Sequence, residues 1–494
     1  MLSDLPDIAA KQAALAPERI ALEEYATGRT FTYAELNRRA GQAAALLNRR
    51  GVEAGDRVAI LSRNCAAFFE LLFACAKVGA ICVPLNWRMP PAELDQLLTD
   101  CTPKLLFYGR EEERTSKGLM YPPPAISLDR DYERRIETLE PLEPRLFWPA
   151  EDIWYLLYTS GTTGRPKGVI YTFGMAVANY VNIGSAIDLR RNDVTASFLP
   201  FFHTAGINLH ALPTLMAGGR VTLIESVEVE TLVTLFEERR FDTFFAVPTV
   251  YQDLLDQPRF AAGPLDHVRH WGCGGAPLPD AVAERYRQLG VRVCNGMGMT
   301  ETGPTAFLLA PEDAWDKIGS VGKPQLLSSV RIVDDDGRDV TDGIVGKLLF
   351  AGPGVTPGYW RNEEATREAF TEDGWLRSGD LARRDDEGFY YIAGREKEMF
   401  ISGGENVYPA EVENVLCSHP AVVEAAVVPV PHEKWGEVGY ASLMLAEDNS
   451  QPSREELEEF CRARLAPYKV PQGFAFVPNF PRTAAGKVQK HLLR

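Results

Sequence analysis

Short apolar, β-branched segments alternate with amphipathic helical segments along most of the chain, and this alternation limits the folds open to it. The segments RVAIL (57–61), AICVPL (80–85) and TFFAVPT (243–249) are typical of buried strands. Between such segments lie stretches with apolar residues near helical spacing, such as residues 32–51, which close on Gly51. This strand–helix–strand repetition predicts an α/β fold with layered, largely parallel sheets.

The chain of 494 residues is too long for one compact core. From about Lys323 the pattern changes to strands and turns, with the turn sequences DDDG, VTDG and DDEG, which predicts a β-rich subdomain ending near Gly394. The segment that follows holds two strand patterns and two helices, one of which begins with a capping box at Ser453 and Glu456. We therefore expect an N-terminal domain over 1–394, a linker over 395–399 and a small α+β domain over 400–494.

Composition excludes several classes of protein. The formal net charge of -16 argues against a surface that binds nucleic acid. The N-terminal residues lack the pattern of a signal peptide, and no apolar run is long enough to predict a membrane-spanning helix. The eight cysteines are scattered, with no CxxC pair, which favours reduced thiols in a cytoplasmic protein. The histidines and cysteines show no metal-ligand spacing.

The strongest local signal is YTSGTTGRPKG at residues 158–168, directly after the apolar run IWYLLY. Its glycines allow close backbone approach, its threonines and serine offer hydroxyl groups, and Lys167 adds a cation, so the segment predicts a polyphosphate cradle. The spacing does not fit a Walker A loop, which requires Gly-Lys-Ser/Thr after the fourth intervening residue. Further blocks are LPFFHTAG (199–206), GGAP (274–277), GMTET (298–302), SGDL (378–381), GREK (394–397) and PRTAAGK (481–487).

These blocks, in this order, resemble the adenylate-forming superfamily, which comprises acyl-CoA synthetases, luciferases and the adenylation domains of peptide synthetases. The resemblance covers nearly the whole chain. It implies ATP, Mg²⁺ and coenzyme A as cofactors, a mobile C-terminal domain, and an active site in the cleft between the two domains. By this resemblance the ATP- and AMP-binding residues are Thr159, Ser160, Gly161, Thr162, Thr163, Gly164, Lys167, Gly275, Ala276, Pro277, Met297, Asp380 and Arg395.

The resemblance also implies catalytic roles. Glu301 matches the magnesium-associated glutamate, Thr300 lies beside the α-phosphate, and Lys487 bridges the carboxylate and the α-phosphate during adenylation. His203 matches a histidine beside the acyl carboxylate. No acidic residue accompanies His203, which argues against an amino-acid substrate. Met297 stands where the family places an aromatic residue against adenine, and its polarizable side chain can still cover the base.

The second half-reaction is expected to join the acyl group to CoA. Glu398 resembles the hinge residue, which is usually Asp or Lys in the family, and Gly403 and Gly404 are expected to line the CoA channel. Small, uncharged residues are the candidates for an apolar acyl pocket: Ala205, Gly206, Val247, Gly274, Gly298 and Met299.

The pocket residues suit an apolar chain or an aromatic ring, and the overall pattern most resembles bacterial fatty-acyl-CoA synthetases, which implies a medium- or long-chain fatty acid as the substrate. The alternatives are an aryl or arylpropenoic (feruloyl- or coumaroyl-type) acid, an enzyme that loads a carrier protein, a luciferase-like oxygenase, and a binding module with an inactive site. A homodimer is possible.

Overall fold

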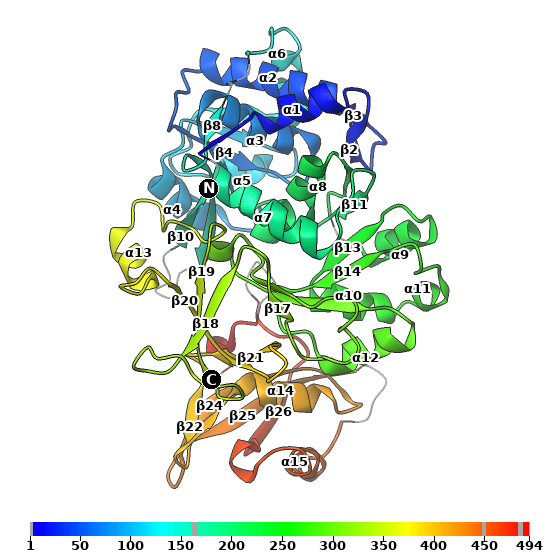
Figure 1. Cartoon of the computed structure of the whole chain (residues 1–494), viewed down its shortest axis with the longest axis vertical. Coiled ribbons are helices and arrows are strands. Elements are labelled where there is room, and N and C mark those ends of the chain that lie inside the picture. The colour runs from blue at the N-terminus through cyan, green and yellow to red at the C-terminus, as the bar shows by residue number, and fades with distance from the viewer. Residues whose placement is uncertain are drawn as a thin grey trace.

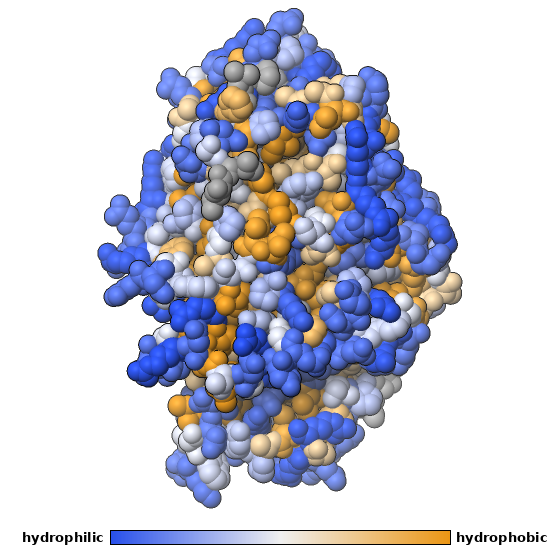
Figure 2. Space-filling view, in the orientation of Figure 1, coloured by the Kyte–Doolittle hydropathy of each residue, from blue (hydrophilic) through white to orange (hydrophobic). Residues whose placement is uncertain are grey.

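A computed structural model of the chain describes residues 3–143, 145, 147–160, 166–226, 228–446, 451–482 and 488–493. Figure 1 shows the helices of the first residues at one end of an elongated molecule and the last strands and α15 at the other. The hydrophilic side chains cover most of the face in Figure 2, with apolar residues gathered near its middle. Within the described residues, no helix has both the length and the apolar character needed to cross a membrane.

The first sheet has six strands in the order β10-β9-β5-β4-β6-β7. The inner strands run parallel, whereas β9 and β10 form an antiparallel hairpin at one edge. Helix α3 is apolar around most of its surface and is buried, as expected for a helix between layers. The bounds are β4 (Arg57–Leu61), β5 (Ile81–Pro84), β6 (Leu105–Tyr108), β7 (Ala125–Ser127), β9 (Ile153–Ser160), β10 (Pro166–Thr172), α2 (Tyr33–Arg49), α3 (Ala66–Val78) and α4 (Pro91–Cys101).

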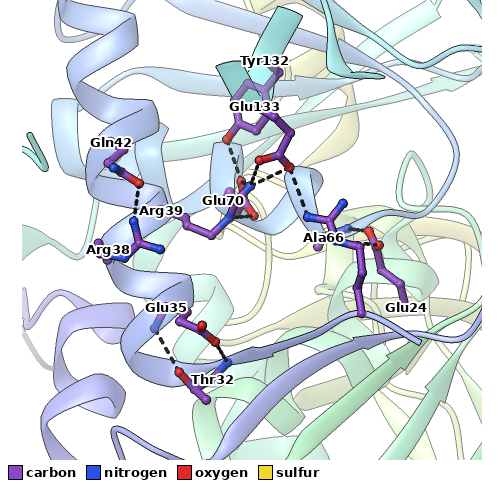
Figure 3. Close-up of polar contacts among 11 residues, drawn as sticks. Glu24, Thr32, Glu35, Arg38, Arg39, Gln42, Ala66, Glu70, Tyr132 and Glu133 are labelled. Atoms are coloured by element: carbon purple, nitrogen blue, oxygen red, sulfur yellow. Dashed lines mark hydrogen bonds and ion pairs between the residues drawn. The ribbon is translucent and has the colours of Figure 1, made fainter. Parts of the chain in front are cut away.

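A buried ion network joins the helices of this layer (Figure 3). Arg39 on α2 donates to both carboxylate oxygens of Glu70 on α3, at 2.6 and 3.1 Å. Arg39 also contacts Glu133 at 2.8 Å, and the Tyr132 hydroxyl donates to Glu70 at 2.8 Å. These contacts satisfy a carboxylate that is almost fully buried, so the network fixes how α2 packs on α3.

The second sheet has nine strands in the order β17-β16-β15-β14-β13-β11-β12-β2-β3, and its central strands run parallel. The last two strands in this order, β2 and β3, come from the N-terminal residues, so this layer is tied to the first one. The bounds are β2 (Ile20–Glu24), β3 (Thr30–Thr32), β11 (Val194–Ser197), β12 (Arg220–Leu223), β13 (Thr243–Ala246), β14 (His270–Cys273), β15 (Val293–Met297), β16 (Phe307–Leu308) and β17 (Lys323–Pro324).

The two faces of this second sheet are built differently, because neighbouring residues of a strand point to opposite sides. On one face Phe244 and Trp271 join a large aromatic core, in which Phe236 of α9 stacks on Trp271 at 5.1 Å. On the other face Phe245 lies against Gly272 of β14. Helices α9 (Val229–Glu237), α10 (Pro248–Leu255) and α12 (Asp280–Gln288) contribute to the aromatic core, whereas α7 (Phe173–Ala186) and the π-helical segment Ala205–Ala211 contribute to the opposite face.

The β-rich part is a four-stranded antiparallel sheet, β18-β19-β20-β21, and the last part is a five-stranded sheet in which β26 extends β23-β22-β25-β24. Strand β21 ends at Arg395 in the former sheet, and β22 begins at Phe400 in the latter. The remaining bounds are β18 (Ser329–Val333), β19 (Gly346–Ala351), β20 (Leu376–Arg384), β21 (Tyr390–Arg395), β22 (Phe400–Ser402), β23 (Glu405–Val407), β24 (Val422–His432), β25 (Gly436–Leu445), β26 (Gly473–Phe476), α14 (Pro409–Cys417) and α15 (Arg454–Arg462).

The predicted fold class is confirmed: a large α/β part is followed by a β-rich part and a small α+β part. The capping box at Ser453 and Glu456 begins α15, with Leu457 and Cys461 buried against the last sheet. The predicted linker at 395–399 falls between strands of two different sheets. The division of the chain at 394 and 400 stays a prediction.

Candidate active site

The β9–β10 hairpin holds the ends of the predicted phosphate loop together. Ser160 pairs with Pro166 and Thr159 pairs with Lys167 across the two strands. The predicted residues Gly161, Thr162, Thr163 and Gly164 lie outside the described residues. The residues that flank this segment are fixed by strand pairing, and Lys167 is the second residue of β10.

Glu301 and Thr300 lie in a short 3₁₀ turn, Thr300–Thr302, just beyond the end of β15. The Glu301 carboxylate is buried, and the Tyr359 hydroxyl donates a hydrogen bond to its Oε1 at 2.9 Å. The Thr356 amide donates to the Glu301 carbonyl at 2.8 Å, and the Tyr171 hydroxyl donates to the Thr300 carbonyl. Backbone and side chain of this turn are therefore both held by residues distant in sequence.

Tyr359 connects the predicted cation to the predicted carboxylate, and the sequence analysis missed it. The segment around it pairs with β10: the Ile170 amide donates to the Gly358 carbonyl at 3.1 Å, and the Trp360 amide donates to the Gly168 carbonyl at 2.7 Å. This pairing places Lys167 Nζ 5.1 Å from the centre of the Tyr359 ring. Burial and the nearby Glu301 carboxylate raise the pKa of Tyr359, so its hydroxyl keeps its proton and acts as a donor.

The Glu301 site fits magnesium of the kind that uses one protein carboxylate plus phosphate oxygens. Among the residues that the structure describes, no three Asp, Glu, His or Cys side chains come together as a metal cage. Glu301 is a single buried carboxylate whose geometry is fixed by Tyr359. Such a site leaves the other positions of the ion to a nucleotide and water.

Asp380 and Arg395, the predicted ribose-binding residues, lie opposite each other on β20 and β21. Arg395 Nε is 3.1 Å from Asp380 Oδ1, and Arg395 Nη1 donates to the Ser378 carbonyl at 3.1 Å. The Asp380 amide donates to the Ser378 hydroxyl at 2.9 Å. The structure thus brings this predicted pair into direct contact at the strand end that leads into the linker.

The predicted adenine residues follow two adjacent parallel strands. Gly274 comes directly after β14, Met297 ends β15, and these strands pair through Gly272 and Cys294. Gly275 has a φ of +86°, which favours glycine, and Gly275, Ala276 and Pro277 are exposed. In parallel sheets, ligands bind beyond the carboxyl ends of the strands, and these residues lie there.

Two predicted acyl-pocket glycines have a backbone reason to be glycine. A Cβ on Gly298 would lie 1.7 Å from the Pro304 carbonyl oxygen, and one on Gly206 would lie 2.2 Å from that of Pro200. At both positions the neighbouring backbone packs so closely that only glycine fits. Met299 packs against the β-rich core, and Val247 packs against the aromatic core and lies within 3.5 Å of a Cβ built on Gly275.

Ala205 packs against an apolar group that we call the Phe245 cluster: Ile183, Ile187, Leu209 and Phe245. A Cβ built on Gly274 would lie 3.3 Å from the Phe245 ring, and one on Gly272 would lie 2.7 Å from it. Phe245 therefore lies against Gly274, which is one of the predicted acyl-pocket residues, and against Gly272, which the sequence analysis did not single out. The pattern TFFAVPT indicated a strand at this position but not which of its two phenylalanines faces the glycines.

His203 lies in the turn that begins the segment Ala205–Ala211. Its amide donates to the Pro200 carbonyl at 3.0 Å, and its ring centre lies 4.4 Å from that of Phe202. The Gly206 amide donates back to the His203 carbonyl at 3.0 Å. The turn thus fixes the backbone of His203, and the imidazole lies against the Phe202 ring.

The predicted CoA-binding glycines form the turn between β22 and β23. Gly403 and Gly404 have φ values of +63° and +89°, both favouring glycine, and both residues are exposed. The Gly403 amide donates to the Trp435 carbonyl at 2.9 Å, so the turn belongs to the last sheet. Glu398, the predicted hinge residue, lies between β21 and β22, whereas Lys487 lies outside the described residues.

The structure brings Glu301 and Lys167 together around Tyr359, and it brings Asp380 and Arg395 together on neighbouring strands. Comparison with known proteins gives the family. The model of the AMP-binding enzyme matches residues 9–360, the model of its C-terminal domain matches residues 411–487, and the chain belongs to the AMP-binding enzyme family.

The relatives are similar along nearly their whole length. A feruloyl-CoA synthase from Amycolatopsis is 39% identical, with 98% of this chain and 97% of the relative covered. The long-chain-fatty-acid–CoA ligase FadD13 from Mycobacterium tuberculosis is 34% identical over 98% and 96%. The structure of o-succinylbenzoate CoA synthetase (MenE) from Bacillus subtilis, in complex with its acyl-adenylate, matches with a TM-score of 0.90 and 32% identity over 100% and 99%.

Proposed function

We propose that the chain catalyses the ATP-dependent joining of a carboxylic acid to CoA through an acyl-adenylate. It is an AMP-forming acid–thiol ligase, with ATP, Mg²⁺ and CoA as its cofactors, as the names of its full-length relatives indicate. The observation that carries this function is the Lys167–Tyr359–Glu301 arrangement, because it combines a cation and a metal-binding carboxylate beside the phosphate loop.

In the first half-reaction a carboxylate oxygen of the acid attacks the α-phosphorus of ATP, and the bond to the β-phosphate oxygen breaks to release pyrophosphate. Two anions must approach each other, so charge neutralisation and positioning supply most of the catalysis. Magnesium, held by Glu301, would supply positive charge at the phosphate oxygens. Lys167 and the hydroxyls of Thr159, Ser160, Thr162 and Thr163 are the proposed phosphate-binding groups.

Other residues are proposed to hold the reactants in place. Asp380 accepts hydrogen bonds from the ribose hydroxyls while Arg395 fixes its carboxylate at 3.1 Å. Gly275, Ala276, Pro277 and Met297 would enclose the adenine, and Thr300 and Lys487 would contact the α-phosphate. His203 would orient the acyl carboxylate. In the second half-reaction the CoA sulfur, having lost its proton, attacks the acyl carbonyl carbon, and AMP leaves.

The substrate we propose is an aromatic or arylpropenoic acid. The support is Phe245, whose ring lies against Gly274 of the predicted acyl pocket and against Gly272, and which would give that pocket a flat apolar wall. A planar ring packs favourably on such a wall, and edge-to-face and stacked aromatic pairs add about 0.5–1.5 kcal/mol. The similarity to feruloyl-CoA synthase at 39% identity agrees with this choice.

A medium- or long-chain fatty acid is the second candidate, because the wall is apolar throughout and FadD13 is 34% identical. An arylpropenoic acid and a long fatty acid differ in how much space they need beyond Phe245. Phe245→Ala would open the wall, so it should improve turnover of a long fatty acid and reduce that of an arylpropenoic acid.

The purified chain should be incubated with Mg-ATP, CoA and matched panels of arylpropenoic, benzoic and fatty acids of increasing length, with thioesters detected by mass. Acyl-CoA with the highest kcat/KM for aromatic acids supports the proposal. Pyrophosphate and AMP without thioester would move the acceptor to a carrier protein. Thioesters formed only from long fatty acids would overturn the aromatic assignment.

A further inference from the structure

Lys490 links the predicted hinge residue to the body of the C-terminal part. Its Nζ lies 2.8 Å from Glu398 Oε2 and 2.7 Å from Glu413 Oε1. Glu398 is in the linker, Glu413 is on α14, and Lys490 begins the 3₁₀ turn Lys490–Leu492. Three segments that are far apart in sequence therefore meet on one ammonium group.

The Lys490–Glu413 pair is largely shielded from water, so its charges interact strongly. The side chains of Lys490 and Glu413 are 21% and 17% exposed, whereas that of Glu398 is 40% exposed. The Val427 amide donates to Glu413 Oε1 at 2.7 Å, which fixes this carboxylate on the sheet. Burial lowers the pKa of Lys490, but the Glu413 and Glu398 carboxylates raise it by more, so the ammonium stays charged. Loss of Lys490 would leave two like charges close together.

The same turn is tethered to the chain just before it. The Gln489 amide donates to the Pro481 carbonyl at 2.8 Å, Arg482 pairs with Val488, and Arg482 forms an ion pair with Glu424 on β24. The described residues on either side of the segment that contains Lys487 are therefore held to the last sheet and, through Lys490, to Glu398.

Helix α14 links the Lys490 cluster to helix α12 of the large domain. Glu413 binds Lys490, and the next residue, Asn414, donates to Asp280 of α12 at 2.9 Å. On the linker side, Lys347 of β19 is 2.9 Å from Glu396. Both domains together match the acyl-adenylate complex of MenE with a TM-score of 0.90, so the cluster exists in a domain arrangement like that of an adenylate-bound ligase.

We propose that Lys490 is a positioning residue for the adenylation half-reaction, because its ion pairs with Glu398 and Glu413 hold the linker and the last turn in the arrangement seen here. The proposal rests on the proposed two-step function. Rotation about Glu398 between half-reactions changes the direction of that side chain, so the Lys490–Glu398 pair breaks whenever the domain turns. The pair then favours one arrangement and sets how readily the domain leaves it.

Lys490→Met is the test, and Lys469→Met is the matched control. Lys469 forms an ion pair with Glu411 of α14 at 2.7 Å. The side chains of this pair are 18% and 42% exposed, close to the 21% and 40% of Lys490 and Glu398, but the pair includes no linker residue. The two half-reactions are measured separately, adenylation by pyrophosphate exchange and thioester formation from synthetic acyl-AMP and CoA. Lys490→Met should lower exchange by about tenfold or more and leave thioester formation unchanged or faster. Lys490→Arg should restore exchange.

Equal losses in both half-reactions, or the same loss in Lys469→Met, would overturn the positioning role. A second measurement does not need activity: hydrogen exchange of the Glu398 and Met399 amides, which donate to the Arg395 carbonyl at 3.1 and 3.2 Å. Lys490→Met should speed this exchange relative to Lys469→Met, and unchanged exchange contradicts the proposal. A wild-type chain that activates no acid would refute the proposed function, while the hydrogen-exchange result would still decide the role of Lys490.

Discussion

Replacing Tyr359 with phenylalanine removes one hydroxyl and keeps the ring. The hydroxyl donates to Glu301 Oε1 at 2.9 Å, and its raised pKa keeps it protonated near neutral pH. The ring continues to lie 5.1 Å from Lys167 Nζ, and the backbone pairing with β10 does not involve the side chain. The substitution therefore isolates a single hydrogen bond to the proposed magnesium-binding carboxylate.

The size of the effect follows from the charge of the acceptor. A hydrogen bond to a charged group contributes about 1.5–3 kcal/mol, roughly twice a neutral one. Each 1.4 kcal/mol is about tenfold in rate or affinity, so Tyr359→Phe should reduce adenylation by about 10- to 100-fold. Because the bond orients Glu301 rather than touching the reacting atoms, part of this loss should appear as a higher magnesium requirement.

Pyrophosphate exchange measured over a range of Mg²⁺ concentrations checks this prediction. The matched control is Tyr391→Phe, whose hydroxyl donates to the Asp385 carboxylate at 3.3 Å outside the proposed site. The control should keep exchange within about twofold of wild type, and thermal unfolding of both variants should be similar. Exchange by Tyr359→Phe that equals wild type at every Mg²⁺ concentration would refute the assigned role of Tyr359.

Three further predictions concern the site and the core. Glu301→Gln, which removes the proposed metal ligand, should lower pyrophosphate exchange by at least about 100-fold with an unchanged unfolding temperature; exchange near the wild-type rate would contradict the assignment. Arg39→Met leaves Glu70 buried without its cation and should lower the free energy of unfolding in urea by about 3–5 kcal/mol, whereas removing both charges should recover much of it. Burial lowers the pKa of His210 to about 4 and that of His270 to about 3, so both side chains are neutral in the folded protein near neutral pH. The free energy of unfolding should therefore be highest above about pH 6.5 and fall at lower pH by about 1.4 kcal/mol per pH unit for each histidine. The double variant His210→Leu, His270→Phe should show a flatter pH dependence in urea titrations at about pH 4.5–7.

Much of the fold was predictable because its strands can be recognised from their own apolar, β-branched residues. RVAIL became β4 with the same bounds, and the apolar run from Ala66 became a buried helix followed by β5. These elements are buried between layers, so nearly every position is apolar and the pattern does not depend on tertiary detail. The capping box at Ser453 is equally local, because its two hydrogen bonds join residues three apart.

The connection through Tyr359 was not predictable, because it depends on contacts between distant segments. Glu301 and Tyr359 are 58 residues apart, and Tyr359 reaches Glu301 only because its backbone pairs with β10 at Val169. In the sequence it is one aromatic residue after a Pro-Gly turn, with no periodicity around it. Lys490 was missed for the same reason, since a lysine near the end of a chain carries no local sign that two carboxylates meet it.

Neighbouring side chains of β13 point to opposite faces of the sheet, and this has a consequence for how the acid specificity of such an enzyme can evolve. Phe244 belongs to the aromatic core, whereas the next residue, Phe245, lies over the glycines on the opposite side of the sheet. Two neighbouring residues of one strand therefore differ in role: Phe244 packs in the core, whereas Phe245 lies on the side of the proposed acid site. Selection for a new acid can act on residue 245 and the glycines beneath it while the packing behind the sheet stays intact, so acid preference can diverge among descendants of one stable scaffold.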